Sequence, residues 1–309
     1  WELLVKIIRT MTLLEKSSVK KRKLKSYIIV GSTVLALQVW GKDYMRVAIT
    51  GSDGYIGSKL VEKLQDSKHD IHLFNIEEWD IRTVPKKGGL PHHWMFYDCV
   101  IHLAALVKVG ESVLKPSEYY DTNINGTRNV IKHFPGAKMI FASTGAAFDP
   151  TSPYAKSKVA AEDIIKAECE EYTIFRFFNV GGGKPNNPEG LYAATVNAME
   201  KGVFTIFGDD YNTKDGTCVR DYVHVEDLCD ALIQAMEEPG ANTDYEPIGS
   251  GQSYTVLEYA KAFLEENGNV FAINSGPRRE GDNESSEVPF MSKFMNPQKT
   301  LKDIVKLWK

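Results

Sequence analysis

A glycine-rich turn constrains the fold of this chain more than any other feature. Gly51, Gly54 and Gly57 are spaced three residues apart. They follow the apolar run Arg46–Thr50 and precede Ser58–Leu64, whose apolar residues have helical spacing. Strand, glycine turn and helix form the context in which backbone can approach a dinucleotide pyrophosphate and a helix can pack closely on a strand. A glycine-rich loop without a ligand is the alternative that the motif alone leaves open.

Short apolar runs alternate with amphipathic segments from Met45 onward. Parallel strands are expected at Val47–Thr50, Ile71–Asn75, Val100–Ala104, Met139–Ser143 and Thr173–Phe178, and crossover helices at Ser58–Leu64, Ser117–His133 and Lys156–Glu170. This alternation predicts an α/β fold with a doubly wound parallel sheet of the Rossmann type over residues 45–180. Residues 181–309 begin with a loop rich in glycine and proline, and they are expected to form mainly a smaller substrate-binding lobe.

Composition disfavours several classes of function. A net charge of −4 and a pI near 6.0 give no electrostatic basis for binding nucleic acid. The four cysteines contain no C-x-x-C pair, so neither a metal site nor a disulfide framework is expected. Reduced thiols fit a cytoplasmic protein.

Residues 1–44 differ in character from the rest of the chain. A basic cluster at Lys20–Lys25 precedes the mostly apolar run Tyr27–Trp40, as in a signal peptide or a short anchor. The run is short for a membrane span. Because Met45 stands directly before the first expected strand, residues 1–44 are interpreted as an upstream extension outside the fold, with no membrane partner. A membrane anchor is the alternative.

A tyrosine and a lysine four residues apart form the predicted proton-transfer device. Tyr154 and Lys158 lie in an expected helix, where positions i and i+4 share one face. The ammonium group is therefore expected to favour the phenolate and to lower a pKa that is ordinarily about 10. Thr144, ten positions before Tyr154, supplies a hydroxyl. A tuned base beside a dinucleotide site predicts redox chemistry on an alcohol.

Longer blocks of sequence resemble the extended short-chain dehydrogenase/reductase family, and in particular its UDP-glucose 4-epimerases. The blocks are Val100–Thr127, Arg176–Asn179, Ile206–Asp227 and Pro277–Asp282. Together the likeness covers nearly everything from Met45 to Asp282. The resemblance implies that Tyr154 is the acid/base, that Lys158 supports the phenolate and contacts ribose, and that Thr144 fills the family's Ser/Thr position.

The same resemblance implies NAD as the cofactor. At the end of the second strand the family usually has an aspartate that binds the adenosine ribose, and here Asn75 takes its place. With no Arg or Lys apparent there to accept a 2′-phosphate, NAD is favoured over NADP. The expected cofactor contacts are Gly51, Gly54, Tyr55, Ile56, Gly57, Asn75, Asp80, Ile81, Leu103, Ala104, Ala105, Asn123, Tyr154, Lys158 and Phe178.

The resemblance also implies which residues bind the UDP-sugar substrate. They are Thr144, Asn179, Leu191, Phe207, Arg220, Tyr222, Arg279 and Asp282. Guanidinium groups suit a diphosphate, although surface ion pairing is the alternative for both arginines.

The activity implied is NAD-dependent 4-epimerisation of a UDP-hexose, UDP-glucose or UDP-galactose, through a transient 4-keto sugar. A 4,6-dehydratase is disfavoured because Gly145 and Ala146 follow Thr144, where that family places an Asp-Glu pair. A decarboxylase, a UDP-N-acetylhexosamine epimerase and a non-catalytic NAD- or nucleotide-sugar-binding protein remain alternatives. Shortened stretches after Asp80 and before Tyr154 leave the preferred sugar open.

A homodimer is also expected from the resemblance, through the helices at Ser117–His133 and Lys156–Glu170. Five apolar residues in the first of these segments support it, namely Tyr119, Tyr120, Ile124, Val130 and Ile131.

Overall fold

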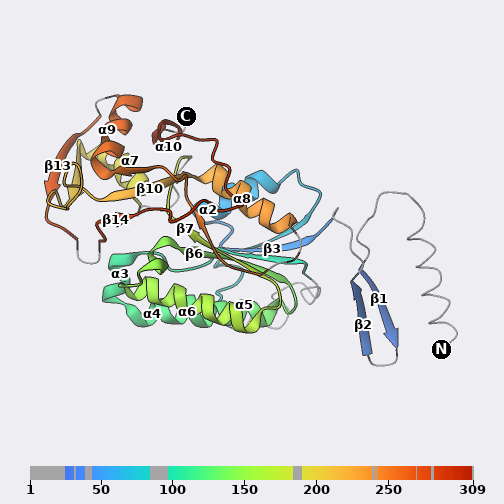
Figure 1. Cartoon of the computed structure of the whole chain (residues 1–309). Helices are drawn as coiled ribbons and strands as arrows, with labels where there is room; N and C mark the ends of the chain where they lie inside the picture. Colours follow the sequence, from blue (N-terminus) through green and yellow to red (C-terminus); the bar gives the residue numbers. More distant parts are fainter. Residues whose placement is uncertain are drawn as a thin grey trace. The chain divides into compact units, whose positions relative to one another are not determined.

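The computed structural model describes most of the chain beyond residue 43 (Figure 1). The described residues are 44–83, 97–183, 190–238, 240, 242–268, 270–279 and 282–307, together with strands β1 (Lys25–Val30) and β2 (Thr33–Gln38). The chain divides into two compact units, one of residues 1–45 and 68–70 and the other of residues 46–67 and 71–309.

In the smaller unit, β1 and β2 pair antiparallel, with Lys25 opposite Gln38. The apolar run that resembles an anchor therefore contains two strands. No helix among the described residues has the length and apolar character needed to cross a membrane.

The larger unit is organised around a six-stranded sheet in the order β11-β7-β6-β5-β3-β4. Its strands are β3 (Arg46–Thr50), β4 (Asp70–Phe74), β5 (Cys99–His102), β6 (Lys138–Thr144), β7 (Tyr172–Phe177) and β11 (Thr243–Ile248). The pairs from β3 to β11 are parallel. Apolar runs form these strands because both faces of a parallel sheet are covered, and all four residues of β5 are buried. The predicted doubly wound α/β fold is confirmed.

Helices cover both faces of this sheet (Figure 1). On one face lie α2 (Tyr55–Leu64) and α8 (Val225–Glu237), and on the other lie α4 (Pro116–Tyr120), α5 (Gly126–His133) and α6 (Pro153–Glu168). The second face contains a core in which Val130 and Ile165 pack with Val100, Met139 and Ile174.

The helix expected at Ser117–His133 is interrupted. A single π-helical turn, Asp121–Asn125, separates α4 from α5. Such turns insert an extra residue into the helical repeat and often occur at functional sites.

A second group of elements follows β7. Strand β8 (Asn179–Gly181) pairs with β10 (Val219–His224), which also pairs with β12 (Ser253–Thr255) and β14 (Ser285–Ser286). Strands β9 (Val203–Phe207) and β13 (Ala272–Gly276) form a parallel pair. Helices α7 (Leu191–Lys201), α9 (Val256–Asn267) and α10 (Leu301–Val305) share a separate apolar core with these strands. The chain returns to the main sheet at α8 and β11.

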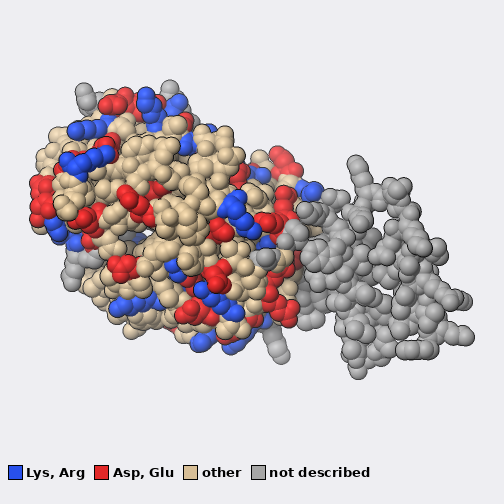
Figure 2. All heavy atoms as spheres, viewed as in Figure 1, with Lys and Arg blue, Asp and Glu red and all other residues tan. Residues whose placement is uncertain are grey.

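Charged side chains of both signs are mixed over the described part of the face shown in Figure 2. Among the described residues in this view, neither sign of charge gathers into one large patch.

Candidate functional site

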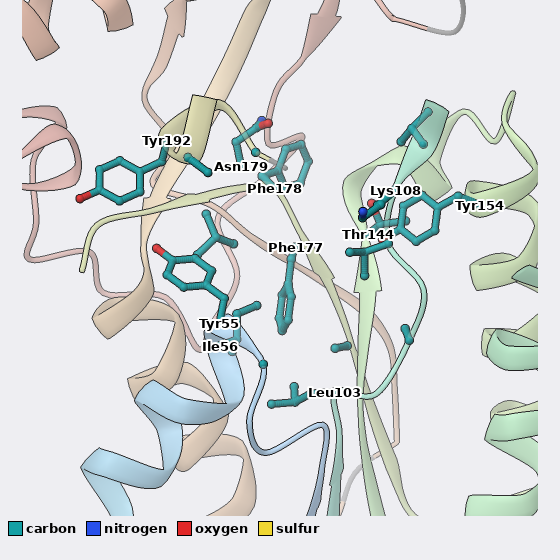
Figure 3. Close-up of a pocket in the computed structure, with 18 of the residues that line it drawn as sticks. Tyr55, Ile56, Leu103, Lys108, Thr144, Tyr154, Phe177, Phe178, Asn179 and Tyr192 are labelled. Carbon is teal, nitrogen blue, oxygen red and sulfur yellow. The ribbon is translucent and has the colours of Figure 1, made fainter. Parts of the chain in front are cut away.

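A cavity of about 640 Å³ opens where β3, β5, β6 and β7 end (Figure 3). Gly51, Leu103 and Phe178 each follow the last residue of one strand, and Thr144 ends another. The cavity therefore lies at the edge of the sheet formed by the carboxyl ends of the strands. The strand order reverses here, because β4 lies on one side of β3 and β5 lies on the other. This edge is the usual ligand position in doubly wound folds.

Many residues expected at a cofactor or substrate site line this one cavity. They are Gly51, Gly54, Tyr55, Ile56, Gly57, Leu103, Ala105, Thr144, Tyr154, Lys158, Phe178, Asn179, Leu191 and Tyr222. In Figure 3, Thr144 and Tyr154 lie on one side of the cavity, and Tyr55, Tyr192 and Asn179 lie on the other. Sequence patterns alone did not assign a role to the lining residues Lys108, Glu111, Ser143, Phe177, Tyr192 and Tyr259.

The glycine turn is packed so closely that side chains are excluded from it. Gly51 has φ +70°, and a Cβ there would lie 2.8 Å from the backbone nitrogen of Ala104. A Cβ on Gly57 would lie 2.1 Å from the carbonyl oxygen of Gly51. Since Gly54 at the N-cap carries no side chain, the first turn of α2 lines the cavity directly. Exposed backbone N–H groups at a helix N-terminus suit a phosphate.

Tyr154, Lys158 and Thr144 come together as their spacing predicts. Tyr154 and Lys158 are both buried on α6, and the Thr144 hydroxyl at the end of β6 hydrogen-bonds to the Tyr154 phenol. The helix is started by Ser152, whose hydroxyl accepts a hydrogen bond from the Ala155 amide at 3.2 Å. The Lys158 ammonium lies 4.1 Å from the centre of the Phe141 ring.

The electrostatics of this group differ from the expectation. Burial raises the pKa of Tyr154, and the hydrogen bond from Thr144 acts in the opposite direction. Burial also lowers the pKa of Lys158 to about 7, against the charge of Glu162. The expected lowering of the phenol pKa was wrong in sign because residue spacing does not reveal how deeply both groups are buried.

Asn123 braces the site from outside the cavity. It lies in the π-helical turn, where its Oδ1 accepts from the Leu106 amide at 2.9 Å and its Nδ2 donates to the Leu106 carbonyl at 3.0 Å. The same Nδ2 donates to the Ser157 hydroxyl at 2.9 Å, and that hydroxyl donates to the Tyr154 carbonyl at 2.7 Å. Asn123 therefore ties the loop after β5 to the helix that carries Tyr154.

A buried histidine, which the sequence analysis did not single out, connects the ends of two strands. Thr127 donates its hydroxyl proton to the Asn123 carbonyl, so it can only accept from Nε2 of His102, at 3.1 Å. Nδ1 of His102 then accepts from the Thr50 hydroxyl at 2.7 Å, whose oxygen in turn accepts from the Ala104 amide at 3.3 Å. Burial lowers the pKa of His102 to about 3, which keeps the ring neutral. The signal in the sequence is a polar residue at the end of an apolar strand.

Three residues expected near the adenosine lie outside the cavity lining. Asn75 accepts hydrogen bonds from the amides of Glu77 and Glu78, at 2.9 and 3.0 Å, and so shapes the turn after β4. Asp80 accepts from both Nε and Nη2 of Arg82, a nearby cation that the sequence analysis overlooked. Ile81 is buried in the core of the sheet.

Four residues expected at the UDP moiety also lie outside the lining. Nη1 of Arg220 donates to the Val219 carbonyl at 2.8 Å. The guanidinium of Arg279 lies 3.7 Å from the centre of the Phe207 ring. The amide of Asp282 donates to the Arg279 carbonyl at 3.3 Å.

Comparison with known proteins agrees with this geometry. A model of the NAD dependent epimerase/dehydratase family matches residues 47–249. The chain is 33% identical to the UDP-glucose 4-epimerase of Erwinia amylovora, over 77% of this chain and 88% of that protein. It is equally identical to the enzyme of Lactobacillus helveticus, over 78% and 87%.

Solved structures of UDP-glucose 4-epimerases also resemble this chain. The UDP-glucose 4-epimerase of Bifidobacterium longum, in complex with NAD+ and UDP, superimposes with a TM-score of 0.74 at 26% identity, over 84% of this chain and 96% of that one. With the sheet order, the cavity and the Thr144–Tyr154–Lys158 group, these matches establish that the chain belongs to the NAD-dependent epimerase/dehydratase family.

Proposed function

We propose that this protein is an NAD-dependent UDP-hexose 4-epimerase that interconverts UDP-glucose and UDP-galactose through a transient 4-keto sugar. The observation that carries the proposal is the junction of the glycine turn with Thr144, Tyr154 and Lys158 on one cavity. Curated relatives that are 33% identical to this chain bear the name UDP-glucose 4-epimerase.

The cavity fits NAD. At Gly51 and Gly57 other backbone atoms lie so close that a Cβ would collide with them. The first turn of α2 presents N–H groups to a pyrophosphate. Lys158 and Phe178 line the part of the cavity assigned to the nicotinamide end. When bound in this cavity, NAD would supply reversible hydride transfer at C4 of the sugar.

The chain's own residues move the proton. Tyr154 removes the proton from the sugar 4-hydroxyl and later returns it, while Thr144 holds the phenol oxygen by a hydrogen bond. Because burial raises the pKa of Tyr154, its phenolate depends on a positive charge nearby. Lys158, one helical turn away, supplies that charge in its ammonium form.

The UDP portion is proposed to anchor the substrate while the sugar turns over. Asn179 and Tyr222 line the cavity, as do Gly190 to Ala193 at the start of α7. Amide groups at the start of that helix suit the diphosphate. Contacts of Arg220, Arg279, Phe207 and Asp282 with UDP remain part of this proposal.

Incubation of purified protein with UDP-galactose, followed by chromatography of UDP-glucose, tests the function. Turnover that is lost in Tyr154→Phe supports the proposal. Bound NAD without turnover of UDP-galactose, or of UDP-N-acetylglucosamine in a parallel assay, would refute the epimerase proposal. A dehydratase is disfavoured because Gly145 and Ala146, which follow Thr144 in a short 3₁₀ turn, carry no group that transfers protons.

A homodimer is proposed through the helices on the α4–α6 face. Within these helices Tyr120 supports it, since 37% of its surface is exposed. Val113 and Leu114, which are 45% and 82% exposed, lie on the helix Val109–Leu114 that packs against α4 and α6. Tyr119 and Val130, expected to contribute apolar surface, are instead fully buried within the chain. Light scattering tests the dimer, and a mass near 34.6 kDa would refute it.

A cytoplasmic location is also proposed. The four cysteines, Cys99, Cys169, Cys218 and Cys229, are free thiols, as expected in a reducing compartment. Cell fractionation followed by immunodetection tests the location, and recovery with membranes would refute it.

A further inference from the structure

Three polar side chains form a buried cluster behind the reacting groups. Oε1 of Glu162 accepts hydrogen bonds from the Ser143 hydroxyl and, at 3.0 Å, from Nε of Arg176. Oε2 accepts from Nη2 of Arg176 at 2.6 Å. Glu162 is 1% exposed and Arg176 is 9% exposed. Such a two-pronged contact between guanidinium and carboxylate fixes both groups in one geometry.

Besides its contact with Glu162, the guanidinium of Arg176 packs against two aromatic rings. The group lies 4.6 Å from the centre of the Phe148 ring and 4.5 Å from that of Tyr245. Phe148 also packs beside Phe178, which lines the cavity. The positive charge is therefore kept next to Glu162 by residues from the 3₁₀ turn after β6 and from β11.

Glu162 lies on the same face of α6 as the reacting groups. It follows Lys158 by four positions and Tyr154 by eight, which places all three side chains along one side of the helix. Burial lowers the pKa of Lys158, and the carboxylate of Glu162 acts in the opposite direction. A buried lysine without such a partner loses its proton at lower pH.

Few other groups can supply this negative charge. His102 on β5, whose pKa the charge of Lys158 helps to lower, is a base and cannot supply a negative charge. On β6 the neighbouring groups are the Phe141 ring and the Thr144 hydroxyl, and neither carries a charge. Of the carboxylates carried by the helices that pack against α6, Glu111 on α3 (Val109–Leu114) and Glu118 on α4 both pair with Lys115. Asp121 in the π-helical turn accepts a hydrogen bond from Asn125. From α5, Arg128 approaches Glu168 near the far end of α6.

We propose that Glu162 is a positioning residue for the reaction, whose carboxylate keeps Lys158 charged beside Tyr154, and that Arg176 and Ser143 hold this carboxylate in place inside the fold. The role in turnover rests on the proposed epimerase function. Arg176 is needed because a carboxylate is costly to bury unless it is paired and hydrogen-bonded, and the two-pronged contact fixes where the carboxylate lies.

The charge state of Lys158 is measured directly by NMR titration of protein labelled with 13C at lysine Cε, with Lys158→Met used for assignment. Glu162→Gln is expected to lower the titration midpoint of Lys158 by about one unit or more. Because that variant leaves a buried guanidinium unpaired, the double variant Glu162→Gln/Arg176→Gln, which removes both charges, is measured with it. Glu168→Gln, a change at an exposed position of the same helix, is the matched control and should leave the midpoint unchanged.

Kinetics separate an electrostatic role from a structural one. As pH rises, Lys158 loses its proton and kcat for UDP-galactose declines. In the double variant this decline is expected to begin at a lower pH than in the parent, even where the two proteins melt at the same temperature. A double variant with the parent's Lys158 midpoint and pH profile would overturn the proposal. Since the NMR titration needs no substrate, it decides the role of Glu162 even if no UDP-hexose is turned over.

Discussion

Gly57→Ala tests whether the glycine turn is shaped by the close packing of α2 on β3. In the parent, the carbonyl oxygen of Gly51 lies 2.1 Å from the position of the new Cβ, and the α carbon of Ser52 lies 2.9 Å from it. Carbon and oxygen do not approach so closely, so α2 and the turn must separate by about 1 Å. Both obstacles are backbone atoms, and no side-chain rotation can relieve the contact.

The displacement acts on the helix end that is proposed to hold the pyrophosphate. A misplacement of about 1 Å in a positioned group costs on the order of 100-fold in function, or about 2.8 kcal/mol in binding. Overpacking also destabilises a fold by about 1–3 kcal/mol. We therefore expect Gly57→Ala to remain folded, to melt at lower temperature and to bind NAD about 100-fold more weakly in isothermal titration calorimetry.

Gly110→Ala is the matched control. Gly110 is exposed on α3, and a Cβ there meets nothing within 4 Å. Alanine in a helix is favoured over glycine by about 0.5–1 kcal/mol, so this variant should be slightly more stable and should bind NAD normally. If Gly57→Ala bound NAD as tightly as the parent and Gly110→Ala, close packing at the turn would not be what positions the cofactor.

Three further predictions follow from the site. Tyr154→Phe should keep its fold and NAD binding but lose about two to four orders of magnitude in kcat, which steady-state kinetics would show; near-normal turnover would remove Tyr154 from the mechanism. His102 has a pKa of about 3 in the fold and about 6.5 when unfolded. As pH falls from 7 to 5, protonation of His102 in the unfolded chain should therefore lower the free energy of unfolding by about 2 kcal/mol. In urea denaturation His102→Gln should lack this loss, and an unchanged pH dependence would contradict the assignment of a neutral histidine. A chain that begins at Met45 should fold and bind NAD, because the main sheet starts at Arg46; failure of calorimetry to detect NAD binding would show that residues before it are required.

The strands of the main sheet were predictable where an apolar run is covered on both faces. The runs at β3, β5 and β6 carry this signal in the sequence, and the structure places strands there. Strand β11 was not foreseen, because Asp244 and Tyr245 are exposed and only its last three residues are buried. Its place depends on pairing with β7, a contact between segments far apart in the sequence.

The site was predictable to the extent that its chemistry lies in local spacing. Tyr154 and Lys158 share a helix, so their proximity follows from the helical repeat. The direction of the Tyr154 pKa shift depends on burial, which three-dimensional packing sets. The cluster of Glu162 with Ser143 and Arg176 joins one helix to two different strands, and no pattern within a single segment indicates it.

The late arrival of β11 has a consequence for synthesis on the ribosome. Strand β7 lies between β6 and β11 in the finished sheet. When β7 has emerged, the chain must still produce α7, β9, β10 and α8 before β11 can pair with it. Throughout that interval β7 is an open edge strand with unpaired backbone groups, which can pair with another nascent chain. Fragments that end soon after residue 180 keep this edge permanently, so aggregation is the characteristic hazard of truncating the protein there.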